Sequence, residues 1–422
     1  MGPKIKELEN RIPGRFWLLA GSQFTSNLAD GMSIVVFTLL ASHQTTSAAK
    51  LGLVLSALSM PWFLFSAFAG TIIDAFGAHA VAVRANLLRF ILFMALGLVS
   101  WQQPSPIIVL AAFALLIGVF EVLSDNAHSV LVPQLIPEQH LERANSVATT
   151  AELAGNRFIG VNLAGFLVGL APVASLGING AAYLLCTLLL VKLAPSRKEP
   201  AAARAGGQVL RLLRDNILFG FNYLWAHKAL ASIAGLGFLW NFTYGAQQSF
   251  LVLFVTQSLR LDEQFYSLAF SAMGIGALIG GFAVNWAIAK WGRMRTLLMA
   301  ITLCALQYPV KYNVPNYYIL LAAAFLEGLT VVMFSTIAVS YRHRTVEEQY
   351  MGRVTASARL ISLGALPLGT LSGGFIAETL GFPMAGAILG TLLFFPSLLL
   401  LAGIKNLGPQ QEVAPQTQEA QS

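Results

Sequence analysis

The sequence is poor in charge and in cysteine, and both shortages limit what the chain can be. Lys, Arg, Asp and Glu together make up 11% of the 422 residues, whereas a soluble domain has about 25%. So few charged side chains cannot cover the surface of a water-soluble fold of this length. Only Cys186 and Cys304 occur, both within apolar runs. We therefore expect neither a disulfide framework nor a cysteine metal site.

Motifs for enzymatic chemistry are missing as well. The sequence contains no Gly-x-x-x-x-Gly-Lys-Ser/Thr phosphate loop and no His-Glu-x-x-His zinc helix. The glycines of 274–280 imitate a dinucleotide loop, but they lie in an apolar run, where small residues serve helix packing. We expect no enzymatic activity, no cofactor and no direct use of ATP. The net charge of +7 is attributed to membrane topology, and no nucleic-acid partner is expected.

What the chain has in abundance is long apolar segments. Hydrophobic residues make up 56% of the sequence, and they come in runs of about 20 residues, the length at which a helix crosses about 30 Å of hydrocarbon. Strands of a membrane barrel would be about half as long and would alternate in polarity. The pattern predicts an all-α membrane protein with twelve transmembrane helices: 16–42, 51–73, 79–100, 106–132, 146–170, 172–194, 230–256, 265–289, 294–310, 316–340, 355–378 and 381–404.

The distribution of basic residues predicts the orientation. An even number of crossings places both termini on one side, and most Lys and Arg residues fall in the loops on that side. Basic loops remain in the cytoplasm. We therefore expect a multi-pass protein of the bacterial cytoplasmic (inner) membrane with both termini inside the cell.

The longest loop separates two halves of similar length. Within 195–228, Leu210, Leu213, Ile217 and Phe221 recur at helical spacing opposite basic residues, which predicts an amphipathic helix on the inner leaflet. The alternative is a solvated linker. The expected organisation is an N-terminal six-helix bundle, a cytoplasmic linker, a C-terminal six-helix bundle and a disordered tail: 1–194, 195–228, 229–407 and 408–422.

The two halves repeat one another. The sequence around Asn27 matches that around Asn241, and the turn at Gly77 matches the turn at Gly292. These and two later matches keep their order at an offset of about 210 residues, as expected for the internal repeats of transporters. A duplicated bundle predicts a substrate site between the halves, near the middle of the bilayer.

Several motifs carry a family resemblance. They are Ser-Asn-Leu-Ala-Asp-Gly at 26–31, Val-Pro-Gln-Leu-Ile-Pro at 132–137, Leu-Glu-Arg-Ala-Asn-Ser at 141–146, Gly-Arg-Val at 352–354 and Pro-Leu-Gly-Thr-Leu-Ser-Gly-Gly at 367–374. With them the chain resembles the major facilitator superfamily over nearly its whole length. It is most similar to the drug:proton antiporter branch that includes macrolide efflux pumps and the enterobactin exporter. Lysophospholipid transporters share part of the first motif.

The resemblance implies the fold and the position of the cavity. The expected fold is the major facilitator fold, two pseudo-symmetric six-helix bundles, in which the first, fourth, seventh and tenth helices surround a central cavity. The antiporter branch often has Gly-Pro in the fifth helix, but here Gly160 is followed by Val161. We therefore expect no proline kink there, and we interpret Gly155, Gly160 and Gly165 as helix-packing residues.

The signature loop of the superfamily is present in eroded form. Between the second and third predicted helices Gly70, Asp74 and Gly77 remain, but the basic residues are gone. The second-half copy keeps Gly292, Arg293 and Arg295. An acid at a helix end near basic residues suits a charge latch that closes the cytoplasmic side. The alternative is a tight turn with a helix-capping carboxylate.

Ionisable residues deep within the predicted helices are the most informative single positions. Each costs about 2.5–3.5 kcal/mol to insert if it is unpaired, so these side chains must face the bundle interior or a wet cavity. Asp125 follows Glu121 by one helical turn, which places both carboxylates on one helix face. We predict proton coupling at Asp30, Glu121 or Asp125, with Arg157 as the charge partner. The alternative is a static ion pair, the role expected for Arg89.

The seventh predicted helix offers aromatic and amide groups suited to an amphipathic ligand, although such side chains also serve as interfacial anchors or packing groups. The substrate-cavity candidates are Asn27, Trp240, Asn241, Tyr244, Gln247, Gln248 and Glu327. Together these features predict a monomeric secondary transporter that exports an amphipathic drug, antibiotic or siderophore by alternating access, with protons as the coupling ion. The alternatives are a lysophospholipid or other lipid transporter, or a sensor or assembly protein that does not transport.

Overall fold

A computed structural model describes residues 14–101, 105–136, 140–193, 206–402 and 404, and in these ranges the secondary structure is helical, without strands. The predicted tail 408–422 lies outside them. The elements are α2 (Gly14–Gln44), α3 (Ala48–Leu64), α4 (Ser66–Phe76), α5 (Ala78–Val99), α6 (Ile107–Leu135), α7 (Leu141–Glu152), π-helical η2 (Leu153–Gly160), α8 (Val161–Leu170), α9 (Pro172–Lys192), α10 (Gly206–Ala226), α11 (Lys228–Gln248), α12 (Leu251–Leu253), π-helical η3 (Phe254–Ser258), α13 (Gln264–Trp291), α14 (Arg293–Asn313), α15 (Tyr317–Thr345) and α16 (Glu348–Ala402).

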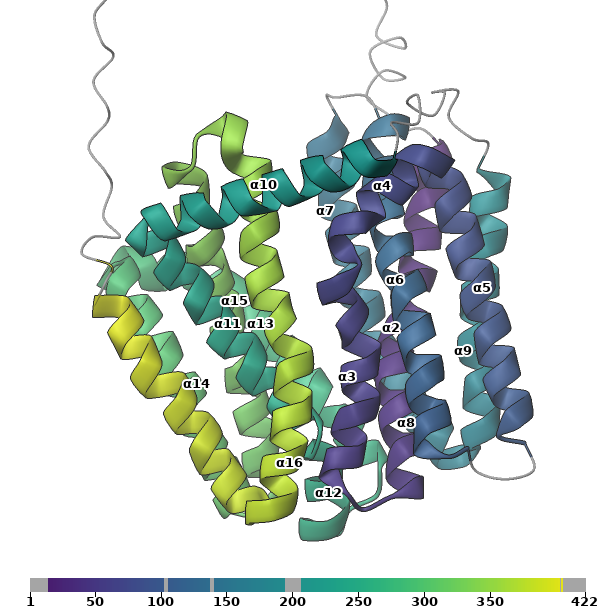
Figure 1. Cartoon of the computed structure of the whole chain (residues 1–422). Helices are drawn as coiled ribbons and strands as arrows, with labels where there is room; N and C mark the ends of the chain where they lie inside the picture. Colours follow the sequence, from purple (N-terminus) through teal and green to yellow (C-terminus); the bar gives the residue numbers. More distant parts are fainter. Residues whose placement is uncertain (1–13, 102–104, 137–139, 194–205, 403, 405–422) are drawn as a thin grey trace, which may run out of the picture.

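The helices form two bundles side by side (Figure 1). Elements α2 to α9 build the N-terminal bundle and α11 to α16 build the C-terminal bundle, while α10 lies across one end of both. We call this the α10 end, and we call the opposite end, where α2 finishes, the His43 end. The all-α fold predicted from the sequence is confirmed, and the arrangement in two bundles matches the expected one.

Fewer helices meet the length and hydropathy expected of a membrane crossing than the twelve that the sequence predicts. Seven helices among the described residues are long and apolar enough to cross a membrane, or eight if α3 and α4 form one bent crossing. However, α16 has 55 residues and contains a break at Gly381, where φ is 78°. A helix of that length would extend about 80 Å, so α16 comprises two crossings. Twelve crossings remains a prediction.

Two glycines mark equivalent turns in the two bundles. Gly77 separates α4 from α5 with φ of 81°, and Gly292 separates α13 from α14 with φ of 78°. Each amide donates a 2.8 Å hydrogen bond to a carbonyl four residues earlier, that of Ile73 or Ile288. Glycine adopts positive φ without steric cost. The matched backbone geometry supports the internal duplication.

Glycines also allow α2 and η2 to touch along their backbones. A Cβ atom at Gly31 would lie 2.1 Å from the carbonyl oxygen of Asn156, and one at Gly160 would lie 2.3 Å from that of Leu28. The packing role expected for Gly155 and Gly160 is confirmed. The segment lacks the proline, but it is not a regular α-helix. Residues Leu153–Gly160 are π-helical, so the helix is irregular here without a proline.

The two bundles meet closely at the His43 end. The ring of His43 on α2 forms an ion pair with Glu263, immediately before α13. Glu378 on α16 accepts hydrogen bonds from the hydroxyl of Ser47 and, at 2.9 Å, from the amide of Ala49 at the start of α3. Toward the α10 end the helices of the two bundles diverge (Figure 1).

Helix α10 is packed against the C-terminal bundle. The hydroxyl of Ser357 donates a 3.2 Å hydrogen bond to the carbonyl of Ile217, and the rings of Phe219 and Tyr350 are 5.0 Å apart. A helix is therefore present at Gly206–Ala226, within the predicted linker, and its position on the inner leaflet stays a prediction.

Candidate functional site

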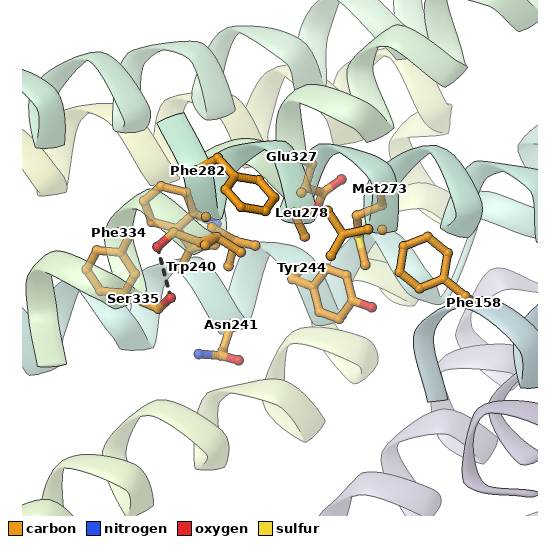
Figure 2. A pocket seen from close by; sticks show the side chains of 16 residues that line it. Phe158, Trp240, Asn241, Tyr244, Met273, Leu278, Phe282, Glu327, Phe334 and Ser335 are labelled. Carbon is orange, nitrogen blue, oxygen red and sulfur yellow. Dashed lines mark hydrogen bonds between the residues drawn. The ribbon is translucent and has the colours of Figure 1, made fainter. Parts of the chain in front are cut away.

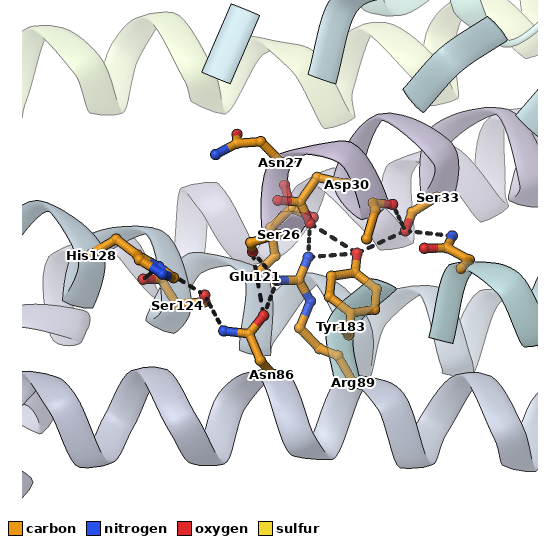
Figure 3. A network of polar contacts seen from close by, with 12 residues as sticks. Ser26, Asn27, Asp30, Ser33, Asn86, Arg89, Glu121, Ser124, His128 and Tyr183 are labelled. Atoms are coloured by element: carbon orange, nitrogen blue, oxygen red, sulfur yellow. Dashed lines mark hydrogen bonds and ion pairs between the residues drawn. The ribbon is translucent and has the colours of Figure 1, made fainter. Parts of the chain in front are cut away.

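A buried ion pair lies at the centre of the N-terminal bundle (Figure 3). Arg89 on α5 pairs with Asp30 on α2, and the two residues are 0% and 2% exposed. The Tyr183 hydroxyl from α9 donates to Asp30 at 2.9 Å and accepts from Arg89 at 2.7 Å. Three helices are thus joined through one carboxylate and one guanidinium, since an isolated charge at this depth would be costly.

This ion pair belongs to a longer chain of polar contacts. On one side Arg89 donates to Ser26 at 3.3 Å, and Asn86 donates to Ser124 at 2.8 Å. Ser124 in turn contacts the ring of His128. The chain connects α2, α5, α6 and α9 within the bundle (Figure 3). For Asp30 this geometry favours the static ion pair over a group that exchanges protons with water.

Glu121 and Asp125 differ from Asp30 in their exposure. Both are half-buried on one face of α6, as the spacing predicts. Glu121 accepts a 3.2 Å hydrogen bond from the indole of Trp62 on α3. Among the described residues neither carboxylate forms an ion pair within 4.0 Å.

The predicted charge partner Arg157 lies in η2, and its side chain is outside the part of the structure that is described. The partner observed for Asp30 is Arg89, which occupies the interior ion-pair role expected for it. Asn27 is buried, and its amide donates at 2.9 Å to the carbonyl of Gln23, one turn earlier in α2.

A large pocket opens in the C-terminal bundle between α11, α13 and α15, with one residue from the N-terminal bundle (Figure 2). Its volume is about 640 Å³, within the usual range for sites of small ligands. The lining is predominantly aromatic and aliphatic, and Glu327 is the single charged residue among the described side chains that form it. The labelled lining residues are Phe158, Trp240, Asn241, Tyr244, Met273, Leu278, Phe282, Glu327, Phe334 and Ser335.

Three of the predicted cavity residues on α11 line this pocket. Trp240 stacks on Phe334 of α15 with ring centroids 4.9 Å apart, and its indole nitrogen has no hydrogen-bond partner among the described residues. Asn241 and Tyr244 follow along the same wall. Gln248 donates at 2.8 Å to the Tyr244 hydroxyl and borders a second, smaller cavity instead.

Gln247 and Glu327 belong to a buried cluster with Lys311 of α14. The Lys311 Nζ atom lies 3.6 Å from Glu327 Oε2. The Gln247 amide bridges the two, because its nitrogen donates to Glu327 and its oxygen accepts from Lys311. Tyr308 adds a 3.3 Å hydrogen bond to the same carboxylate. Glu327 therefore faces the pocket on one side and an ammonium on the other.

Lys311 lies one residue beyond the predicted helix 294–310. The structure places it within α14, where it is 1% exposed. The predicted crossing was shorter than the about 20 residues that a bilayer requires. Extension by one turn would have included Lys311 and revealed a second deep charge opposite Glu327.

The residues of the predicted charge latch lie at the two glycine turns, between α4 and α5 and between α13 and α14. Asp74 is exposed at the end of α4 and forms no ion pair with a described residue. Gly70 and Gly77 have open space around them, as has Gly292. Arg293 is half-buried at the start of α14, and Arg295 is exposed there.

Two matched bundles of apolar helices, with buried charges in each and a pocket between helices, define a multi-pass membrane transporter. Sequence comparison agrees, because the model of the Major Facilitator Superfamily matches residues 19–308 and 233–421. The chain belongs to this superfamily. It is a transporter and not an enzyme.

Individual relatives are distant. The uncharacterized MFS-type transporter y4rN of Sinorhizobium fredii is 27% identical over 89% of this chain and 92% of its own length. The multidrug efflux pump Tap of Mycolicibacterium fortuitum is 22% identical with the same coverage. These proteins support the resemblance to the drug efflux branch.

Solved structures share the fold at low sequence identity. The nucleoside transporter NupG (D323A mutant) superposes with a TM-score of 0.76 at 14% identity and covers 93% of this chain and 100% of its own. A bacterial homologue of the iron transporter ferroportin in an inward-facing state has a TM-score of 0.73 at 15% identity, with 93% and 99% coverage. At these identities the likeness concerns the fold alone.

Proposed function

We propose that this transporter exports amphipathic small molecules across the bacterial inner membrane in exchange for protons. The observation that carries the proposal is the composition of the large pocket, which combines an aromatic lining with a single carboxylate, Glu327. Such a lining binds molecules that have an apolar body and one polar group. The multidrug efflux pump Tap, a relative over most of the chain, points in the same direction.

Alternating access would proceed by rocking of the two bundles. The contacts of His43 with Glu263 and of Ser47 with Glu378 hold the bundles together at one end. The α10 end, where they diverge, is the predicted cytoplasmic side. We therefore propose that the structure represents a state that opens toward the cytoplasm.

Proton coupling is assigned to Glu121 and Asp125. Both carboxylates are half-buried without an ion-pair partner among the described residues, unlike Asp30. Two acids on one helix face disfavour simultaneous ionisation, so one of them can take up a proton in one state and release it in the other. Asp30 and Arg89 would keep the bundle rigid while this happens.

Proteoliposomes with an imposed pH gradient test the proposal. Wild-type protein should accumulate a fluorescent amphipathic dye against the concentration gradient of the dye. The pH gradient should collapse faster when the dye is present. Glu121→Gln and Asp125→Asn should each reduce pH-driven transport at least tenfold while dye binding persists. Asp215→Asn is the matched control, because this exposed acid lies on α10 and its ion-pair partner among the described residues is its neighbour Arg214. Undiminished pH-driven transport in both variants would remove these two acids from the scheme.

Lipid transport remains a second candidate because of one observation. Phe282 lines the pocket and is also 85% exposed, with Leu278 at 48% beside it. The pocket wall thus includes side chains on the outer surface of α13, where acyl chains could approach. A lysophospholipid translocation assay in the same proteoliposomes separates the two functions.

A further inference from the structure

We infer that Lys311 is a second proton-releasing group, coupled to the arrival of a cation at Glu327. When a monovalent cationic group binds the Glu327 carboxylate from the pocket, Lys311 loses its counterion and gives up one proton. The inference rests on the proposed function, and it adds an exchange site in the C-terminal bundle that is separate from Glu121 and Asp125.

The positions of the two residues support an exchange. Glu327 lines the large pocket, whereas Lys311 does not and borders a small cavity of about 20 Å³ next to it. A ligand that enters the pocket therefore meets the carboxylate without meeting the ammonium. The aromatic walls around Glu327, including Trp240 and Tyr244, also favour a cation, because ring faces attract positive charge.

The contacts of Lys311 explain why it would respond. Its side chain is 1% exposed, and its single acidic partner among the described residues is Glu327 at 3.6 Å. The rings of Tyr308 and Tyr312 lie 5.0 and 5.1 Å away, and they compensate only part of the charge. The other titratable groups nearby are Cys304 on α14 and Tyr266 on α13, which faces Tyr312. The tyrosine and cysteine side chains are neutral, so none of them replaces Glu327 as a counterion.

The charge balance of the exchange is one for one. Before binding, the ammonium and carboxylate form a neutral pair. A cation that takes the carboxylate would leave an unpaired ammonium in an apolar interior, which costs several kcal/mol. Lysine can avoid this cost, because it can lose a proton when it is buried, whereas arginine stays charged. One N–H bond of Lys311 breaks, the proton passes to water, and neutral Gln247 and tyrosine side chains remain around the free amine.

Proton release on binding tests the inference directly. Full-length protein in detergent and weak buffer is titrated at pH 7 with ethidium, a permanently charged aromatic cation, while a pH dye reports released protons. Protons released by Glu121 and Asp125 are eliminated by working in the Glu121→Gln/Asp125→Asn background. In this background, the protein with Lys311 intact should release about one proton for each ethidium bound. In that background, Lys311→Arg should abolish the release and weaken ethidium binding at least tenfold.

Two further variants keep the outcome decisive. Lys290→Arg is the matched control, because Lys290 lies over Trp286 and Trp291 outside the cluster, and it should behave as the background does. The double change Lys311→Met/Glu327→Gln leaves no charge in this cluster and should fold, yet it should neither bind ethidium tightly nor release protons. Binding and release that survive Lys311→Arg or the double change would overturn the inference.

The proposed function fails under a different result. If wild-type proteoliposomes transport no amphipathic dye of any charge, the export function itself is wrong. If they transport dyes but ethidium releases no proton in the Glu121→Gln/Asp125→Asn background, only the role of Lys311 is wrong.

Discussion

The guanidinium of Arg89 lies over the ring of Tyr183, with its central carbon 3.9 Å from the ring centroid, while it also donates to the Tyr183 hydroxyl. One aromatic side chain therefore contacts the cation through both its face and its oxygen. With Asp30 as the counter-charge, this arrangement fixes the relative rotation of α2, α5 and α9.

The buried ion pair should be essential for stability. Asp30→Ala would leave Arg89 without its counter-charge at 0% exposure, and loss of one partner of a buried pair costs about 3–5 kcal/mol. We expect a strong decrease in the thermal denaturation midpoint of purified protein. The double change Asp30→Asn/Arg89→Met removes both charges and should recover most of the loss. If Asp30→Ala melts like the wild type, the pair has no structural importance.

The contact of α2 with η2 should tolerate no side chain. Gly31→Ala would place a methyl group 2.1 Å from the Asn156 carbonyl oxygen, so the helices must separate. We expect lower yield of folded protein and a lower denaturation midpoint. Gly177→Ala on α9 is the control, because nothing lies within 4 Å of its added Cβ. Equal behaviour of the two variants would show that the close approach is not required.

A covalent link at the His43 end should stop transport. His43→Cys with Glu263→Cys joins α2 to the start of α13 at a contact that already exists. The oxidised protein should bind dye but transport it at less than a tenth of the wild-type rate, because one state of the cycle is closed to it. Reductant should restore transport. Full activity in the oxidised state would show that these two residues need not separate.

The aromatic wall should contribute to substrate affinity. Trp240→Ala removes the ring that stacks on Phe334 in the pocket, and removal of an aromatic contact weakens binding by about 1–3 kcal/mol. We expect the dissociation constant of an aromatic dye, measured by fluorescence titration, to rise about tenfold or more. Trp225→Ala on α10 is the control, since this tryptophan is 71% exposed and should leave the constant unchanged.

The sequence predicted the helices well because apolar length and glycine turns are local signals. The sequence predicts the turn glycines and four of the residues that line the pocket: Gly77, Gly292, Trp240, Asn241, Tyr244 and Glu327. The conformational freedom of a glycine and the aromatic, amide or acidic character of a pocket residue are properties of the residue itself and of its place in one helix. The lining of a cavity by α11 and α15 follows once the family resemblance supplies the order of the helices.

Partners across helices could not be predicted in the same way. Asp30 pairs with Arg89 of α5, whereas the sequence left open which carboxylate Arg157 would pair with, and the Arg157 side chain lies outside the described part of the structure. Successive residues point about 100° apart around a helix, so a small change in rotation selects another partner. The pair of Lys311 with Glu327 depended on a helix boundary, because the predicted helix 294–310 stops one residue before Lys311, whereas α14 continues to Asn313.

The docking of α10 has a mechanical consequence. Phe219 and Ile217 hold this helix on the C-terminal bundle, while it also reaches α4 of the other bundle. A helix of 21 residues is about 30 Å long, so tilting the docked end by about 10° would carry the distant end about 5 Å. The linker would then act as a lever arm that amplifies a small rotation of one bundle into a sweep across the face of the other.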